Sequence, residues 1–319
     1  MIENGSSVTA IQTRAPAKVV LWGEYAVLAG APAAVLALNR NAEVKLEPAE
    51  LFSSFTASGL LAPGLHTPEL PDLPITSLLL AILKHLNKKE ALGAVRCHMD
   101  TSRFYADGEK LGIGSSAALC VALYHAVCAY IEHQPNLQEA IEIHRVWQGG
   151  SGSGMDIAAS WHGGVIRFQN GEVSQIEWPD SLFFDVIYTG SSASTFAQIG
   201  KFSEWRNTGD TSTLDELCAQ SEALFSNYTQ EAAWADYIAA LRALDQAGHL
   251  NIFTQEHERL ATIAHGLSVA YKPCGAGGGD IGISISNDPS RLTEFRQQAT
   301  QAGFTSLQTE IALHGVHSR

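Results

Sequence analysis

The distribution of apolar and polar residues predicts several strands in the first fifty residues. Residues 14–28 form an almost uninterrupted apolar run that contains one lysine, Lys18. Residues 33–38 are also apolar, residues 42–46 form a second largely apolar segment that includes Glu43 and Lys45, and the polar triplet 39–41 between them predicts two paired strands joined by a turn. The fold is therefore expected to begin with a small set of neighbouring strands.

Helical periodicity dominates two later parts of the chain. Residues 117–131 are nearly all apolar or small, and apolar side chains recur four apart, which predicts a buried helix. Asn136 followed by Glu139 is a capping signal, so a second helix is expected to begin there and to end near residue 148. Residues 212–265 show mostly helical patterns with polar faces.

Strand signals return between and after these helices. The dipeptide Asn170–Gly171 predicts a hairpin between residues 164–168 and 173–178, because Asn-Gly favours the tight turns that join antiparallel strands. Residues 182–188 and 281–285 are short, nearly continuous apolar runs, which predict buried strands. The chain therefore mixes both kinds of element along most of its length.

The chain has 319 residues, which is enough for one large or two medium domains. Residues 48–74 are rich in Pro, Ser and Gly and predict an irregular excursion. The sharpest change of composition lies near residue 180. We therefore expect two domains, residues 1–180 and 181–319.

Composition and charge narrow the range of partners. The net charge of −13 and the pI near 5.3 argue against nucleic acid or an anionic membrane as the main partner. An anionic substrate would therefore need a locally basic pocket. The N-terminus lacks a signal segment and no apolar run approaches the length of a membrane span, so we expect a cytoplasmic protein. The five cysteines lack CxxC spacing and sit mostly in apolar runs, which indicates buried thiols.

Three loops of small residues stand out as candidates for binding an anion. Residues 110–118 place two glycines and two serines directly before the predicted helix 117–131, where free amides of a helix N-terminus favour a phosphate. Residues 149–155 lead to one carboxylate, Asp156. Residues 272–280 contain four glycines in five positions, which is typical of backbone that passes very close to another group.

Each of these features also has a purely structural interpretation. The first loop can be an ordinary turn capped by Ser115 or Ser116, and Asp156 can be a helix N-cap. Lys18 can reach the surface or pair with a structural acid. The polar loop 189–195, which follows the predicted strand 182–188, is equally compatible with an anion site and with a plain surface loop.

Several common motifs are absent from the sequence. It contains no GxxxxGK[ST], no dinucleotide-binding GxGxxG after a strand, no GxSxG and no HExxH. The remaining features are three separate loops of small residues, a lysine flanked by apolar residues (Lys18) and an aspartate at the end of one loop (Asp156). Phosphoryl transfer uses such parts, because its transition state is stabilised by positioning, magnesium and cations.

Together the loops resemble the motifs of the GHMP small-molecule kinases. Residues 15–25, 110–118 and 272–280 correspond to the first, second and third motifs in the family's order, although Ile113 stands where Leu is common and the usual Pro before the second motif is missing. The resemblance implies an α+β fold with two domains. The N-terminal domain would be ribosomal protein S5-like and bind ATP, and the C-terminal domain would be ferredoxin-like.

The resemblance also implies roles for individual residues. Lys18 and Asp156 would be catalytic, and Ser115 or Ser116 would contact Mg²⁺ together with ATP oxygens and water. ATP would be bound by Lys110, Gly112, Gly114, Ser115, Ser116 and Ala117. The acceptor would be bound by Lys18, Ser153, Gly154, Asp156, Ser191, Gly277 and Gly278.

Within the family, residues 144–156 and 161–168 most resemble the members that act on phosphomevalonate, so the resemblance implies this small-molecule acceptor. Members that act on mevalonate carry a magnesium-binding Glu where this chain has Arg145 and Gln148. The alternatives are mevalonate or another small acceptor, and a ligand sensor without turnover, against which the intact Lys18 and Asp156 argue. The protein is expected to be a monomer or a homodimer. Candidate cations for the acceptor's charges are Lys18, Arg145, Arg167, Lys201 and Lys272.

Overall fold

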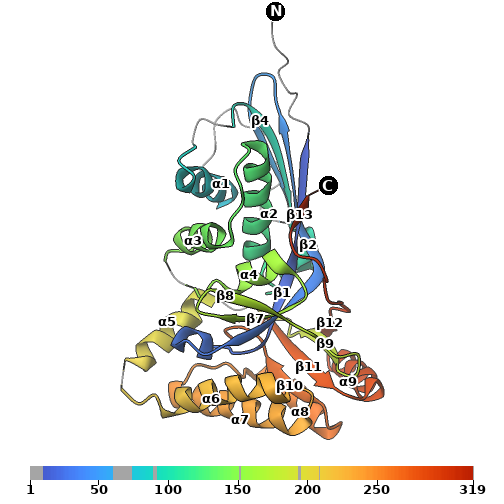
Figure 1. The fold of residues 1–319 in the computed structure, drawn as a ribbon. Coiled ribbons are helices and arrows are strands. Elements are labelled where there is room, and N and C mark those ends of the chain that lie inside the picture. The colour runs from blue at the N-terminus through green and yellow to red at the C-terminus, as the bar shows by residue number, and fades with distance from the viewer. Residues whose placement is uncertain are drawn as a thin grey trace, which may run out of the picture.

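Two β-sheets stacked along the long direction of the molecule organise the fold (Figure 1). The computed structural model describes residues 10–59, 74–88, 92–150, 152–192, 195–207 and 209–318. Most of the predicted excursion 48–74 lies outside these residues. Over the described ranges, no helix combines the length and the apolar character that crossing a membrane requires.

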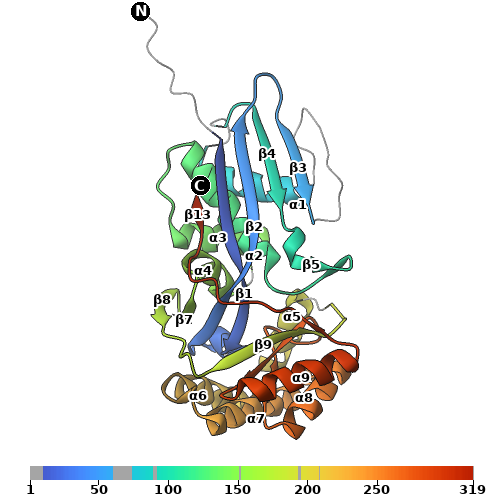
Figure 2. The same cartoon turned by 90° about the vertical axis from the view of Figure 1, so that its right-hand side faces the viewer.

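The first sheet contains seven strands in the described part of the chain. Its central strand β2 pairs with β1, with β4 and with β7 along different parts of its length. The strands are β1 (Ile11–Trp22), β2 (Ala33–Pro48), β3 (Ser54–Ser58), β4 (Val95–Asp100), β7 (Val165–Gln169), β8 (Glu172–Ile176) and β13 (His317–Ser318). Figure 2 shows the C-terminal segment returning from the lower sheet to place β13 beside β1.

Four helices cover one face of the first sheet (Figure 1). They are α1 (Pro74–His85), α2 (Ser115–Tyr130), α3 (Leu137–Trp147) and α4 (Met155–His162). Between β4 and α2 the chain forms a short 3₁₀ turn, η2 (Ser102–Phe104), and a small hairpin of β5 (Tyr105–Ala106) and β6 (Glu109–Lys110). Helix α2 is apolar on all sides because it is buried, and it packs against β1, where Thr13 Oγ1 donates to the Ala122 carbonyl (2.7 Å).

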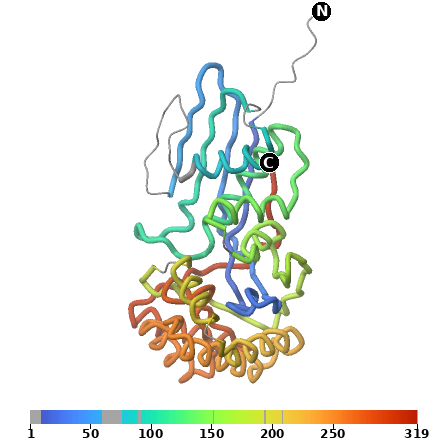
Figure 3. The backbone as a smooth tube through the Cα atoms, turned by 90° about the vertical axis from the view of Figure 1, so that its left-hand side faces the viewer, coloured from blue at the N-terminus to red at the C-terminus, as the bar shows by residue number. Residues whose placement is uncertain are grey.

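The second sheet is antiparallel, with the strand order β10-β11-β9-β12. Its strands are β9 (Phe183–Tyr188), β10 (Ala270–Pro273), β11 (Ile281–Ser286) and β12 (Thr305–Ser306). The helices of this half are α5 (Thr195–Arg206), α6 (Ser212–Asn227), α7 (Glu231–Gly248), α8 (Gln255–Gly266) and α9 (Pro289–Gln301). Figure 3 shows the segment between β1 and β2, which includes η1 (Ala26–Ala29), reaching down to these helices.

Most of the predicted elements are confirmed. Helix α3 begins where predicted, because the Asn136 side chain accepts hydrogen bonds from the amides of Gln138 (2.8 Å) and Glu139 (3.3 Å). The hairpin around Asn170–Gly171 is β7 and β8, and the helical patterns over residues 212–265 are α6, α7 and α8. Four of the five cysteines are buried, and all five are free thiols.

The prediction of two strands over residues 33–46 is wrong. They form one strand, β2, of 16 residues. Ala17 pairs with Leu38 and the adjacent Pro16 pairs with Asn41, so the residues between 38 and 41 form a β-bulge rather than a turn. Arg40 in this bulge donates to the Leu307 carbonyl (2.8 Å), so the polar triplet anchors the C-terminal segment.

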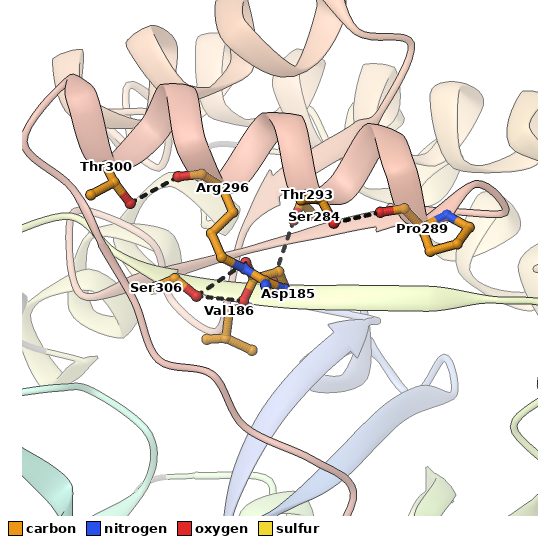
Figure 4. Close-up of polar contacts among 8 residues, drawn as sticks. All are labelled: Asp185, Val186, Ser284, Pro289, Thr293, Arg296, Thr300 and Ser306. Atoms are coloured by element: carbon orange, nitrogen blue, oxygen red, sulfur yellow. Dashed lines mark hydrogen bonds and ion pairs between the residues drawn. The ribbon is translucent and has the colours of Figure 1, made fainter.

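Helix α9 is held on the second sheet by a buried carboxylate (Figure 4). Asp185 of β9 is 3% exposed, and its Oδ2 lies 2.7 Å from Nε of Arg296. Ser306 Oγ and the Val186 amide donate to Oδ1 at 2.8 and 3.0 Å. The carboxylate therefore exchanges its water contacts for one cation and two neutral donors.

The two arginines of α9 provide a matched stability test. Arg296→Met is expected to lower the free energy of unfolding by about 1–3 kcal/mol, because it leaves Asp185 buried without its cation. Arg291, on the same helix, pairs with Asp288 and Glu231 at the surface, so Arg291→Met is expected to cost less than about 1 kcal/mol. Denaturant unfolding measures both values. Equal decreases in the free energy of unfolding for the two variants would contradict the conclusion that the buried Asp185 depends on Arg296.

Candidate active site

A cleft of about 640 Å³ collects most of the residues that the sequence singles out. Its walls come from the end of β1, the loop before α2, helices α3 and α5, the start of α4, and the loop between β10 and β11. The predicted site residues that line it are Lys18, Lys110, Gly112, Gly114, Ser116, Ser153, Gly154 and Asp156. Ser115, Ala117, Ser191, Gly277 and Gly278 are not among the residues that line it.

The first and second motifs contact each other through Lys18 and Gly114. The Lys18 amide donates to the Ile113 carbonyl (3.0 Å), so β1 fixes the loop directly. Gly114 has φ +83°, and a Cβ at this position would lie only 2.8 Å from Cε of Lys18. A side chain at Gly114 would therefore be strained and would displace the lysine that enters the cleft.

The second and third motifs meet at Gly112. A Cβ on Gly112 would overlap the side chain of Asp280, which also lines the cleft. The backbone of Asp280 is fixed from both sides, because its amide donates to the Ser191 carbonyl (2.7 Å) and its carbonyl accepts from the Thr189 amide (2.9 Å). Ser191 therefore supports the third motif through its backbone.

The N-terminus of α2 opens into the cleft. Its N-cap residue is Gly114 in the left-handed region, and among the described residues no side-chain cap hydrogen bond forms there, so neither serine caps the helix. Ser116 lines the cleft and accepts from Gln148 Nε2 (3.2 Å). Ser115 is 6% exposed and Ala117 is fully buried, so they support the loop from beneath. The free amides and the helix dipole at this end would favour an anion.

Asp156 lies in the first turn of α4, and the N-cap of that helix is Gly154. The N-cap interpretation of Asp156 is therefore wrong. Its carboxylate accepts from the Ile157 amide (3.1 Å) and remains half-buried on the cleft wall. Lys18 lines the same cleft and has no ion-pair partner within the residues that the structure describes. The two groups thus face one space without being locked to each other.

Lys272 is a structural cation rather than a ligand for substrate. It is 1% exposed, and its Nζ forms an ion pair with Glu24 and donates to the Pro273 carbonyl (2.8 Å). Tyr237 of α7 donates to the other oxygen of Glu24 (2.5 Å) and accepts from the Gly23 amide (2.7 Å). The buried charge is therefore compensated within the fold, although Glu24 reaches the floor of the cleft.

The other candidate cations divide between cleft and surface. Arg167 pairs with Glu222 (3.4 Å) and lies over the ring of Phe225, so it does not line the cleft. Lys201 is exposed and also lies outside the residues that line it. Arg145 of α3 lines the cleft while pairing with Glu142 (3.4 Å). Lys18 and Arg145 are therefore the proposed cations that the structure places at the site.

His257 holds the third motif in place through two hydrogen bonds, a contact that we call the His257 clamp. Its Nε2 lies 3.0 Å from the Gly279 carbonyl and its Nδ1 lies 2.8 Å from the Tyr271 hydroxyl. A carbonyl only accepts, so Nε2 carries the proton and Nδ1 accepts from the tyrosine. Burial lowers the pKa of His257 to about 4, which keeps the imidazole neutral and this pattern intact at neutral pH.

Sequence patterns did not single out Tyr25 or His144, and both line the cleft. Tyr25 donates to the Ala276 carbonyl (2.6 Å), which connects the first motif with the third, and burial raises the pKa of its hydroxyl. His144 lies on α3, just before Arg145. Both lie in segments that carry the resemblance to the kinase family, residues 15–25 and 144–156. The spacing of residues within those segments does not identify either one as a site residue.

Comparison with known proteins shows which family the chain resembles. Residues 76–164 match the family profile described as "GHMP kinases N terminal domain". Over 367 aligned positions the chain is 26% identical to the phosphomevalonate kinase of Streptomyces sp. (strain CL190), covering 96% of this chain and 98% of that protein. The chain is therefore similar to the GHMP kinases. It is also 26% identical over 373 positions to the mevalonate kinase of Homo sapiens, with coverage of 95% and 93%.

A solved structure agrees with this similarity at the level of the fold. The chain aligns with Streptococcus pneumoniae phosphomevalonate kinase in complex with phosphomevalonate and AMPPNP at a TM-score of 0.77, with 18% identity and coverage of 95% and 100%. At this identity the likeness establishes the fold. The GHMP kinase fold predicted from the sequence, with a ribosomal protein S5-like N-terminal and a ferredoxin-like C-terminal domain, is confirmed.

Two glycines with nearly the same φ test the contact between the loop and Lys18. Gly114→Ala is expected to weaken the binding of an ATP analogue by about tenfold or more, because the new Cβ meets Lys18 beside the anion-binding end of α2. Gly108 has φ +82°, and a Cβ added there would meet no described residue within 4 Å apart from its chain neighbours, so Gly108→Ala imposes the same backbone strain without the contact. Calorimetry on both folded variants measures the difference. Equal affinities would remove this loop from the site.

The clamp formed by His257 predicts a pH dependence of stability. Its folded-state pKa of about 4 lies below the usual 6.5, so the unfolded chain binds the proton first and the free energy of unfolding falls as the pH drops through this window. One such group contributes up to about 1.4 kcal/mol per pH unit. His257→Gln keeps a donor for Gly279 but takes up no proton, so its stability should depend less steeply on pH.

Denaturant unfolding between pH 4 and 7 measures these slopes. The matched control replaces His265 by Gln, because His265 lies on the same helix but is exposed. Slopes that agree between the wild type and His257→Gln would show that the imidazole is not buried as described.

Proposed function

We propose that this GHMP kinase transfers the γ-phosphoryl group of ATP to 5-phosphomevalonate, producing 5-diphosphomevalonate and ADP in the mevalonate route to isoprenoids. The observation that carries the proposal is one cleft lined by Lys18, Asp156 and the uncapped N-terminus of α2. These are the parts that phosphoryl transfer requires, namely donors for phosphate oxygens, a cation for the transferred group and an orienting carboxylate.

The choice of acceptor rests on α3. Arg145 and Gln148 both line the cleft, and Gln148 donates a hydrogen bond to Ser116. Phosphomevalonate brings a carboxylate and a phosphate toward an anionic nucleotide, so a cation on this wall suits it better than an acidic side chain would. The phosphomevalonate kinase relative matches the chain over nearly its whole length, which supports the same choice.

The reaction follows from this arrangement. An oxygen of the acceptor phosphate attacks the γ-phosphorus, the bond from that phosphorus to the bridging oxygen breaks, and ADP leaves with the electron pair. Because the second pKa of a phosphate is about 6, the acceptor is largely ionised at pH 7 and needs no strong base. Asp156 then orients the acceptor electrostatically, while Lys18 stabilises charge on the transferred group and the α2 amides hold the nucleotide phosphates.

Magnesium fits the site as a partner of the nucleotide. The described residues contain no group of three or more His, Cys, Asp or Glu side chains that could hold a metal ion. The Ser116 hydroxyl lines the cleft and would be a protein ligand, with Ser115 buried behind it. Mg²⁺ retains several waters and binds through few protein groups, so this donor set suits it, and it would neutralise phosphate charge.

The two sheets support the proposed domain boundary. Strands β1 to β8 all lie before residue 180, and β9 to β12 form the second sheet. The last strand, β13, comes after residue 180 but returns to pair with β1. A division into residues 1–180 and 181–319 would therefore place Lys18 and Asp156 on one domain and Asp280 on the other. The cleft would then lie between an ATP-binding domain and its C-terminal partner.

Mevalonate is the second candidate acceptor, because a mevalonate kinase matches the chain at the same 26% identity and Asp156 faces the cleft. An alcohol acceptor must lose a proton during transfer, and Asp156 is a carboxylate placed where it would accept that proton. The chemistry of the two acceptors therefore predicts different behaviour when Asp156 loses its charge.

Replacing the two charged groups tests the function and the acceptor together. With phosphomevalonate, Asp156→Asn should retain measurable activity with a flat profile above about pH 7, because the acceptor is already ionised. With an alcohol acceptor the same change should cost about 10² to 10⁴ in rate, and the residual activity should rise with pH. Lys18→Met should lower kcat by about 10² or more with either acceptor.

ADP release is measured with phosphomevalonate, mevalonate, homoserine and sugars. Lys201→Met is the matched control, because Lys201 is exposed and does not line the cleft. We expect turnover of phosphomevalonate. Turnover of mevalonate alone, with a rising pH profile for Asp156→Asn, would overturn the acceptor and leave the kinase assignment in place.

A further inference from the structure

His144 is a cleft-lining residue whose side chain carries a buried nitrogen that is unpaired among the described residues. The side chain is 4% exposed, yet the residue lines the cleft. Its Nε2 is buried and has no hydrogen-bond partner within the residues that the structure describes. Buried polar atoms are paired in the large majority of cases, because an unpaired donor costs about 1–3 kcal/mol. An unpaired nitrogen beside a ligand cleft therefore points to a ligand atom as its partner.

The surroundings of His144 identify which part of the cleft it serves. It lies close enough to Asp156 and Lys18 for both charges to act on its ring, in opposite directions. Burial is the largest effect and lowers the pKa of His144, so the imidazole is neutral at pH 7 and carries one N–H. The ring of Trp147 lies 6.0 Å away between centroids, and its Nε1 donates to Ser77 (2.8 Å), which anchors this end of α3.

We propose that His144 binds an oxyanion of the acceptor, its carboxylate or its phosphate, by donating a hydrogen bond from Nε2. This inference rests on the proposed function, which places the acceptor beside Lys18 and Asp156. A neutral donor binds an anion without needing to be protonated. Asp156 is not the partner, because no hydrogen bond joins the two side chains and its carboxylate accepts from the Ile157 amide.

The chain contains a matched control for this histidine. His125 of α2 also has a buried Nε2 without a partner in the described part of the chain. It packs edge-on against Trp161, with ring centroids 4.4 Å apart, and it is not among the residues that line the cleft. Replacing His125 therefore measures the cost of removing a largely buried imidazole with an unpaired nitrogen away from the acceptor.

The experiment compares His144→Phe, His144→Gln and His125→Phe. His144→Phe is expected to raise the KM for phosphomevalonate by about 10- to 100-fold, the effect of losing one hydrogen bond to a charged group, while leaving the KM for ATP unchanged. His144→Gln restores an N–H donor and should recover most of the loss. His125→Phe should leave both KM values unchanged.

Three results would overturn the inference. They are an unchanged acceptor KM in a folded His144→Phe protein, an equal rise in the KM for ATP, and a His144→Gln variant as impaired as His144→Phe. If the Phe variant does not fold, nitrogen NMR on the wild type keeps the test decisive, because acceptor binding must shift the Nε2 resonance of His144. No shift at saturating phosphomevalonate would refute the contact.

Comparing the binding of phosphomevalonate and mevalonate distinguishes the two possible oxyanions, the carboxylate and the phosphate. If His144→Phe weakens the binding of phosphomevalonate and mevalonate equally, the contact is to the carboxylate that both share. If only phosphomevalonate is affected, the contact is to the phosphate. A wild type that does not phosphorylate phosphomevalonate refutes the proposed function instead, and the binding measurements on His144 still stand as a separate result.

Discussion

The buried ion pair between Glu24 and Lys272 is the interaction on which the site depends most. Glu24 follows β1 of the first sheet, Lys272 lies in β10 of the second, and both are 1% exposed. Tyr237 from α7 completes the carboxylate's hydrogen bonds. Removing either charge would leave the other buried and uncompensated, typically at a cost of 3–5 kcal/mol. The pair therefore fixes the end of the strand that carries Lys18 against the sheet that carries the third motif.

Close contacts of two glycines bring the loop before α2 against the other two motifs and so shape the cleft. Gly114 lies against the Lys18 side chain and Gly112 against Asp280, so the loop before α2 fits between the other two motifs where a Cβ would not. The N-terminus of α2 then faces the cleft, with no side-chain cap among the residues that the structure describes. These glycines thus allow three segments that are distant in the sequence to converge on one cleft.

Local patterns in the sequence predicted most of the elements, because burial periodicity and capping act over a few residues. Helix α2, the Asn136 cap of α3 and the Asn170–Gly171 hairpin are of this kind. The bulge in β2 was mistaken for a turn, since Arg40 has its partner at Leu307, far along the chain. The burial of His144 and its lack of a partner among the described residues also depend on segments that are distant in the sequence, so the spacing of residues does not identify His144 as a candidate.

The two lysines of the first and third motifs show why sequence alone could not assign the cations. Both are flanked by apolar residues, and burial of either charge is unfavourable without an anion. Lys272 has its anion inside the protein, in Glu24, and is thereby lost to any ligand. Lys18 has no such partner in the described ranges and lines the cleft. In a chain of net charge −13, the location of one acid therefore decides which lysine stabilises the fold and which remains in the cleft without an ion-pair partner among the described residues.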